Sequence, residues 1–68
     1  MENWDCKKEK YTKTPEKLEK FFKEIEGVCK KHGYSIGHED GHGSFEIQEF
    51  LESNIDWLMN AHFRLKGT

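Results

Sequence analysis

Tyr34-Ser-Ile-Gly-His-Glu-Asp-Gly-His-Gly-Ser-Phe-Glu-Ile-Gln-Glu-Phe50, residues 34–50, is the stretch that decides the fold. On both sides of its glycine-rich centre, large side chains alternate with small or polar ones, which is the period of two expected of half-buried strands. Asp40-Gly41, between the two runs, is a turn signal. The stretch therefore predicts a β-hairpin whose apolar side chains share one face, and we expect that face to be buried.

Two loops are compatible with this hairpin. A two-residue loop at the turn signal would set Ile36 opposite Phe45. A four-residue loop over 40–43 keeps the same faces and changes only which residues are paired. The sequence does not choose between them. The choice matters because only the longer loop leaves His42 free to turn to the side of His38.

The segment before the hairpin has the signals of a helix. Thr14 is expected to cap its N-terminus, Pro15 suits the first helical position and Glu16 favours the positive end of the helix dipole. Gly33 is typical of a left-handed C-cap. Between them one stripe of side chains recurs every three or four residues, at Leu18, Phe21, Phe22, Ile25, Val28, Cys29 and His32. The pattern predicts a helix that turns this stripe toward the core.

A second helix is predicted after the hairpin. Ser53, followed by Asp56 three residues later, resembles an N-cap with an acid in the first turn. Apolar positions then continue at helical spacing to Leu65. The chain is thus expected to form one small α+β domain over residues 1–68, with the order α-β-β-α after an N-terminal arm. Its expected parts are an arm over 1–13, a helix over 14–33, the hairpin over 34–50 and a helix over 53–66.

The composition predicts a thin core. Of 68 residues, 34% are hydrophobic and 35% are charged, and domains of this size often add a disulfide, a metal or a partner. Two cysteines, Cys6 and Cys29, are too few for a disulfide scaffold, and in a reducing compartment they fit free thiols or metal ligands better than a bridge. No run is apolar enough for a signal peptide or a membrane span, so a cytosolic protein is expected.

Charge is divided unevenly along the chain. Residues 1–33 carry nine lysines against seven acids, whereas residues 34–68 carry two basic residues against six acids. The lysines alternate with glutamates at helical spacing, which is typical of a solvated face, and no direct contact with nucleic acid is expected. The alternative is a zinc-stabilised nucleic-acid-binding or transcription-regulating module. It would use the lysines of the arm, which are Lys7, Lys8, Lys10 and Lys13.

His38-Glu-Asp-Gly-His42 matches the zincin pattern of two histidines four apart with a glutamate beside the first. That pattern works only on a helix, which brings both imidazoles to one face over a zinc ion. The glycines here indicate a turn, so metalloprotease activity is not expected. No phosphate-binding loop or catalytic triad is recognisable either, and we do not expect an enzyme.

The same histidines suggest a structural metal site at the hairpin tip. A strand that turns back from Gly33 rises about 3.3 Å per residue, so His38 would lie level with the start of the first helix. The arm could bring Cys6 there, and the second helix could bring His62. The expected zinc ligands are therefore Cys6, His38, His42 and either Asp40 or His62. Cys29 would lie at the wrong end of the helix and is a less favoured replacement.

The segment from Gly33 to Ile47, together with Asn54-Ile-Asp-Trp-Leu58, resembles a family of very small proteins encoded by tailed phages and prophages of Gram-positive bacteria. The resemblance covers roughly residues 18–61, and its most specific part is the His-Glu-Asp-Gly-His-Gly run beginning at His38. A zinc-containing anti-CRISPR inhibitor of a type II effector nuclease is similar. The resemblance implies that His38, Asp40 and His42 are the motif positions, while Cys6 and His62 fall outside the matched stretch.

This resemblance implies a protein that inhibits the host's type II CRISPR nuclease in the cytoplasm of the infected bacterium. We expect the domain itself to be monomeric or to associate weakly. Such a nuclease has positively charged channels for guide and target, which an acidic protein can occupy. The acids expected to bind this partner are Glu39, Glu46, Glu49, Glu52 and Asp56.

Overall fold

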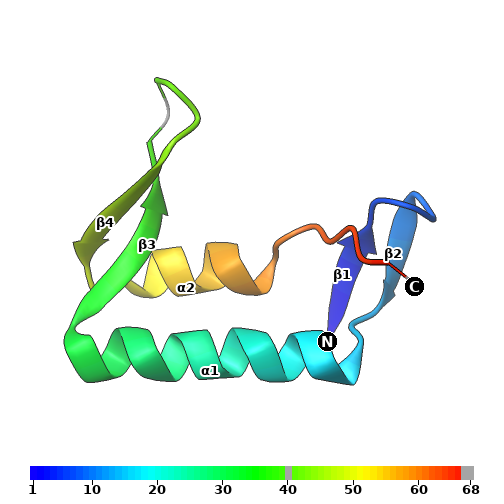
Figure 1. Ribbon diagram of the computed structural model, residues 1–68, viewed down its shortest axis with the longest axis horizontal. Helices are drawn as coiled ribbons and strands as arrows, with labels where there is room; N and C mark the ends of the chain where they lie inside the picture. The colour runs from blue at the N-terminus through cyan, green and yellow to red at the C-terminus, as the bar shows by residue number, and fades with distance from the viewer. Residues whose placement is uncertain (40, 67–68) are drawn as a thin grey trace.

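The computed structural model describes residues 1–39 and 41–66 and confirms the α+β class. Its elements are β1 (Glu2–Asp5), β2 (Lys10–Lys13), α1 (Glu16–His32), β3 (Tyr34–His38), β4 (Phe45–Glu49) and α2 (Glu52–Met59). The strands form two separate antiparallel pairs, β1 with β2 and β3 with β4. Figure 1 shows α1 along the bottom, α2 above it, and one hairpin rising near each end of α1.

The start of α1 differs from the expectation. The helix begins at Glu16, and its N-cap position is Pro15, which makes no side-chain capping hydrogen bond. Thr14 is buried and its hydroxyl donates to the Asn3 side-chain oxygen, so it is not free to cap the helix. The other end agrees with the prediction. Gly33 has φ 76° and donates its N–H to the Cys29 carbonyl, as a left-handed C-cap does.

The arm is not irregular but forms the hairpin β1–β2, in which Trp4 pairs with Tyr11. Asp5 closes its turn, because its side-chain oxygen accepts the N–H groups of Lys7 (2.9 Å) and Lys8 (3.2 Å). The buried positions of this hairpin are polar. Asn3 is 1% exposed and Asp5 is 2% exposed, so a search for apolar alternation could not find these strands.

The second helix is shorter than expected, ending at Met59 rather than at residue 66. Beyond it the chain runs beside β1: Phe63 donates its N–H to the Trp4 carbonyl (2.9 Å), and its own carbonyl accepts from Cys6 (2.8 Å). Asn3 stabilises this exit, since its amide donates to the carbonyls of Met59 and Ala61, both at 2.8 Å. Pairing with β1 therefore replaces continuation of the helix.

The start of α2 also differs from the expectation. The helix begins at Glu52 with Leu51 at the N-cap position, and no side chain caps it. Ser53, the expected cap, lies inside the helix and is exposed.

The hairpin β3–β4 has the register of the longer loop. Ile36 pairs with Ile47 and His38 with Phe45, and Glu39 donates its N–H to the Ser44 carbonyl (2.8 Å). This is the pairing of a four-residue loop over 40–43, not of the two-residue loop.

The core is thin, as the composition predicts. Its buried apolar residues are Phe22, Cys29, Ile55 and Phe63. Among the described residues, every buried side-chain nitrogen or oxygen has a hydrogen-bond partner. These hydrogen bonds offset the free-energy cost of removing the polar groups from water. In the described part of the chain, no helix combines the length and apolarity needed to cross a membrane.

Candidate interaction groove

An open apolar groove runs between the helices and the hairpin β3–β4. One hollow of about 540 Å³ lies between α1 and the hairpin, and a second of about 520 Å³ lies between the hairpin and α2. Both are lined by Ile25, Cys29, Ile36 and Ile47. Because these four residues belong to both hollows, the two form one continuous surface.

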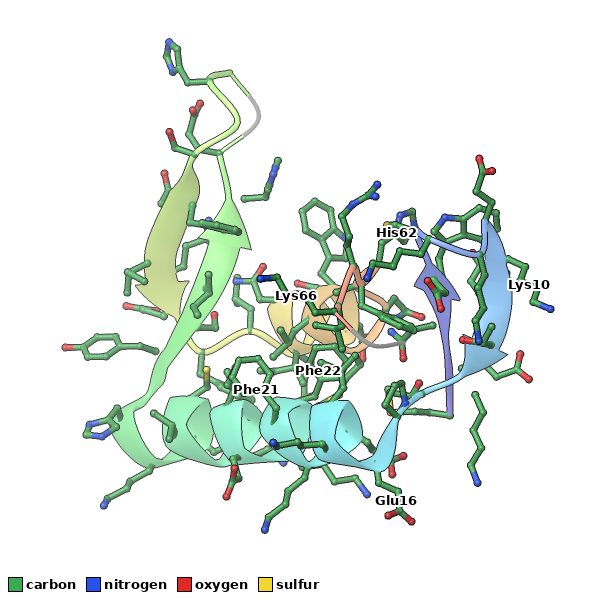
Figure 2. The ribbon with its side chains drawn as sticks, turned by 45° about the vertical axis from the view of Figure 1, so that its right-hand side comes forward. Lys10, Glu16, Phe21, Phe22, His62 and Lys66 are labelled. Atoms are coloured by element: carbon green, nitrogen blue, oxygen red, sulfur yellow. The ribbon has the colours of Figure 1, made fainter. Side chains whose placement is uncertain are left out.

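The groove exposes an unusual amount of apolar side chain. Its large hydrophobic residues are between 46% and 78% exposed, and they are Phe21, Val28, Tyr34, Ile36, Phe45, Ile47 and Trp57. Phe21 projects from α1 on the side of the hairpin, next to the buried Phe22 (Figure 2). Contiguous apolar surface of this kind marks binding sites in proteins of this size. The expectation that the apolar face of the hairpin is buried is therefore wrong.

The opposite face of the hairpin is covered instead, through hydrogen bonds centred on Ser35. The Ser35 hydroxyl donates to the Glu49 carbonyl (2.7 Å) and accepts from the Asn54 amide (2.9 Å). The same Asn54 amide donates to Gln48 (2.8 Å). Gly37 lies on this face too, where a Cβ would come within 2.7 Å of the Gln48 side chain. Small and polar residues thus join the hairpin to the start of α2 and leave its apolar residues facing the groove.

His38 belongs to the groove. Its ring lies edge-on to Phe45, with centroids 6.2 Å apart, and edge-on to Trp57, with centroids 5.9 Å apart. Such edge-to-face contacts are favourable for aromatic rings. The imidazole therefore packs as an aromatic side chain between β4 and α2.

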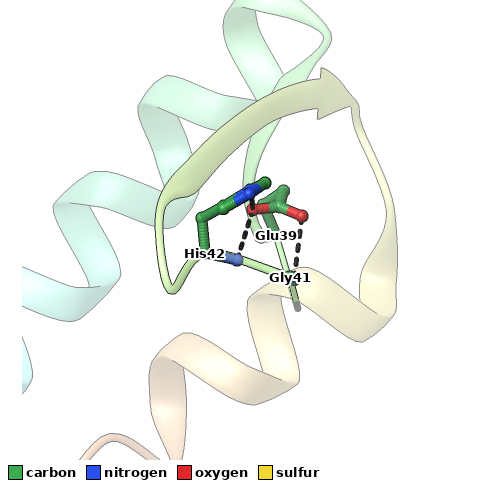
Figure 3. A network of polar contacts seen from close by, with 3 residues as sticks. All are labelled: Glu39, Gly41 and His42. Atoms are coloured by element: carbon green, nitrogen blue, oxygen red, sulfur yellow. Dashed lines mark hydrogen bonds and ion pairs between the residues drawn. The ribbon is translucent and has the colours of Figure 1, made fainter.

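Glu39 organises the described part of the hairpin tip (Figure 3). Its carboxylate accepts the N–H groups of Gly41 and His42, each at 2.8 Å, and one oxygen lies 3.1 Å from Nδ1 of the His42 ring. The two backbone N–H groups lower the pKa of Glu39, because they stabilise its charged form. The Glu39 carboxylate thus contacts both the backbone N–H and the ring of His42.

The described residues do not assemble the expected zinc site. Cys6 follows β1 and lies beside Phe63, at the far end of the molecule from the β3–β4 tip. His62 lies near Trp4, with ring centroids 6.0 Å apart, and not near the tip. Asp40 lies outside the described residues. Within residues 1–39 and 41–66, no three His, Cys, Asp or Glu side chains group as metal ligands would, so we derive no function from a metal.

The five acids expected to bind a partner do not form one face. Glu39 lies at the tip, and Glu52 and Asp56 lie on α2. On β4, Glu49 pairs with Tyr34 on the groove side, whereas Glu46 pairs with Gly37 on the opposite side. The segment that contains these acids, residues 32–63, has six acids and no lysine or arginine. The hairpin and α2 walls of the groove therefore belong to an acidic segment, whereas its third wall, α1, also carries lysines.

Sequence reasoning identified most of the groove residues but placed them in the core. Phe21 and Val28 have the helical spacing of buried residues, and nothing in that spacing distinguishes a covered stripe from an uncovered one. The small side chains of Ser35 and Gly37 were the available signal for which face of the hairpin is covered. A helix can approach a strand most closely where the side chains of the strand are small.

Together, the fold and the groove define a small α+β domain with an uncovered apolar surface at its acidic end. No family model matches the chain, and no curated protein and no solved structure matches it.

Proposed function

We propose that this protein acts by binding another protein through the apolar groove, and that the partner is a type II RNA-guided CRISPR nuclease of an infected bacterium, which it inhibits. The observation that carries the proposal is the exposed groove, whose hairpin and α2 walls belong to a segment, residues 32–63, without lysine or arginine. The resemblance of its hairpin motif to an anti-CRISPR inhibitor supplies the identity of the partner.

The two properties of the surface have different roles in this proposal. Apolar side chains such as Trp57, which is 61% exposed, supply binding free energy when a partner covers them. The surrounding acids attract the basic channels of such a nuclease and raise the association rate. Glu49 lies on the groove side of β4 and is the acid best placed to contact the same partner surface.

The test is inhibition of target DNA cleavage by the purified nuclease with its guide, together with binding measured by calorimetry. Wild-type protein should bind and inhibit, and Trp57→Ala should weaken binding by about tenfold or more, the effect of removing an aromatic anchor. Tyr11→Ala is the matched control, because Tyr11 is equally exposed at 65% but lies on β2, outside the groove. Failure of the wild-type protein to bind the nuclease would refute the proposal.

One observation favours the nucleic-acid-binding alternative. All four lysines of the arm lie on or beside one hairpin, next to three aromatic rings. Trp4 lies 5.2 Å from Tyr11 and 6.0 Å from His62 between ring centroids, and Figure 2 shows Lys10 and His62 at this end of the molecule. Exposed rings beside lysines are the usual elements of single-strand binding.

This alternative is distinguished by the isolated protein. Binding of a fluorescent single-stranded oligonucleotide, weakening steeply with salt and lost in Tyr11→Ala, would support it. Under the inhibitor proposal, the same variant keeps full activity against the nuclease and the oligonucleotide is not bound.

A further inference from the structure

Strand β4 is an open sheet edge. Among the described residues it pairs only with β3, and no other strand and no helix backbone lies along its outer edge. Its link to α2 is the side-chain hydrogen bond from Asn54 to Gln48, on the covered face of the hairpin. Figure 1 shows β4 on the side of the hairpin that faces away from α2. Open edges are ready to pair with another chain, and proteins normally protect them with charged side chains, especially lysine, with proline or with a covering element. Residues 45–49 contain neither lysine nor proline, and their only charges are the acids Glu46 and Glu49.

The hydrogen bonds at the ends of the hairpin show which backbone groups face outward. Glu39 donates its N–H to Ser44, and Phe50 donates its N–H to Gly33. Because bonded pairs alternate along an antiparallel ladder, residues 46 and 48 bond to β3. The backbone N–H groups at 45, 47 and 49 therefore point away from β3, along the open edge.

We propose that β4 pairs antiparallel with β4 of a second copy of this chain, around a two-fold axis at Ile47. The product is a dimer with a continuous four-stranded sheet in the order β3-β4-β4-β3. This register sets Ile47 opposite Ile47, and Phe45 opposite Glu49. It uses all five residues of each strand, and it pairs the outward-facing groups of one edge with those of the other. The Glu49 carbonyl already accepts the Ser35 hydroxyl, and its second lone pair remains for the new bond.

The charges of the strand favour this arrangement. With the axis at Ile47, Glu46 faces the neutral Gln48 of the second copy, and Glu49 faces Phe45, so no two acids are directly opposite. A parallel in-register pairing would set Glu46 beside Glu46 and Glu49 beside Glu49, which is unfavourable. Charge therefore selects the two-fold arrangement over the parallel one.

The apolar side chains favour it as well. Phe45 and Ile47 are 78% and 66% exposed and lie on the groove side of β4. In the dimer the two Ile47 side chains pair directly, and each Phe45 lies diagonally beside Ile47 of the other copy, within reach of contact. The grooves of the two copies then share one continuous apolar sheet face.

The size of the single chain supports a covering partner. Its accessible surface is 5427 Å², against about 4,500 Å² expected of a compact monomer of this mass. Its radius of gyration is 12.9 Å, against about 10.9 Å expected for its length. The excess surface is comparable to the roughly 800 Å² that each side contributes to a stable interface.

The first test is the oligomeric state of the tag-free protein by sedimentation equilibrium, with a matched pair of variants. Phe45→Glu sets an acid opposite Glu49 at two places in the dimer and should weaken dimerisation by about tenfold or more relative to Phe45→Lys. Phe45→Lys creates two opposite-charge pairs while removing the same aromatic ring. A wild-type protein that stays monomeric, or equal dimerisation of the two variants, would overturn the proposal.

The second test locates the axis by crosslinking in a Cys6→Ser background, which leaves only the buried Cys29 of the native thiols. Ile47→Cys brings two thiols opposite each other, at a Cα separation of about 5.5 Å that a disulfide spans. It should therefore give a covalent dimer on mild oxidation. Phe45→Cys places its two thiols roughly 14 Å apart and should remain uncrosslinked. Crosslinking at 45 but not at 47 would refute the register.

Discussion

At the scale of single residues, Ser35 and Gly37 decide which face of the hairpin is covered. A serine hydroxyl can satisfy three backbone and side-chain partners at once, and a glycine leaves room for the Gln48 side chain. These two positions hold α2 against the polar face of the hairpin. The consequence is that Ile36, between them in sequence, faces the groove with its side chain 46% exposed.

Glu39 should make the hairpin tip sensitive to acid. Hydrogen bonds from the Gly41 and His42 N–H groups lower its pKa in the folded protein. A carboxyl whose pKa is lowered by folding contributes stability above its unfolded pKa and loses it as the pH falls through the folded value. We therefore expect the tip to loosen as the pH drops below about 4.3, the ordinary pKa of glutamate.

The measurement is an NMR titration that follows the amide resonances of Gly41 and His42. Both should shift with one common pKa below that of a free glutamate, and their protection from solvent exchange, relative to the intrinsic rate at each pH, should fall on the acid side. Glu39→Gln is the control, since it keeps the shape of the side chain but does not titrate. An unchanged titration of these two amides in Glu39→Gln would contradict the assignment.

At the scale of elements, the sequence predicted what local chemistry determines. The helix α1, the Gly33 C-cap and the alternation of β3 and β4 all follow from short-range patterns, and each is present in the fold. The expectation that the whole α1 stripe faces the core is wrong, because only its Phe22 and Cys29 are buried.

The hairpin β1–β2 was missed because its buried positions, Asn3 and Asp5, are polar. The early end of α2 depends on contacts between residues more than fifty positions apart, such as Asn3 with Met59. Those contacts bury polar groups, and hydropathy patterns carry no signal for them.

The junction between α2 and β1 yields a prediction about stability. Asn3→Ala removes the two hydrogen bonds to the carbonyls of Met59 and Ala61 and the acceptor of the Thr14 hydroxyl. We expect a loss of about 2–3 kcal/mol in the free energy of unfolding, since partly buried acceptors lose their partners. Urea denaturation followed by circular dichroism measures it.

Asn60→Ala is the matched control for this prediction. Asn60 also donates its side-chain amide to a helix carbonyl, that of Asp56, at 2.7 Å, but the bond is exposed. Its removal should cost less than about 1 kcal/mol, because water replaces the lost partner. Equal losses in the two variants would mean that the buried junction has no special role.

At the scale of the whole molecule, the two ends differ in chemistry. The end built from β1, β2 and the chain around Phe63 is held by buried polar contacts and carries lysines on its surface. The end built from β3, β4 and α2 carries acids and the apolar groove. The separation of these ends explains why Cys6 and His62 do not lie near His38 and His42. The sequence prediction placed residues of both ends together because it assumed that the hairpin β3–β4 folds back along α1. In the structure the hairpin rises away from α1 (Figure 1).

Zinc binding stays a prediction of the sequence, and the structure makes it testable. Purified protein that contains about one zinc per chain should lose stability on chelation. In that case His42→Ala should lower Tm before chelation but not after it, while His32→Ala should have no effect in either state. His38→Ala should lower Tm in both states, because His38 packs against Phe45 and Trp57. Metal-free protein with unchanged Tm in His42→Ala would contradict zinc binding at the tip.

The parallel bridge between Asp5 and Phe63 joins segments from opposite ends of the described chain. During synthesis, α1 and the hairpin β3–β4 can form from neighbouring residues as soon as they emerge. The bridge has to wait until Phe63 has left the ribosome. Until then β1 has β2 on one side but lacks Phe63 on the other. The buried Asn3 also lacks its carbonyl acceptors, so the nascent chain should remain a target for proteases and chaperones late into translation.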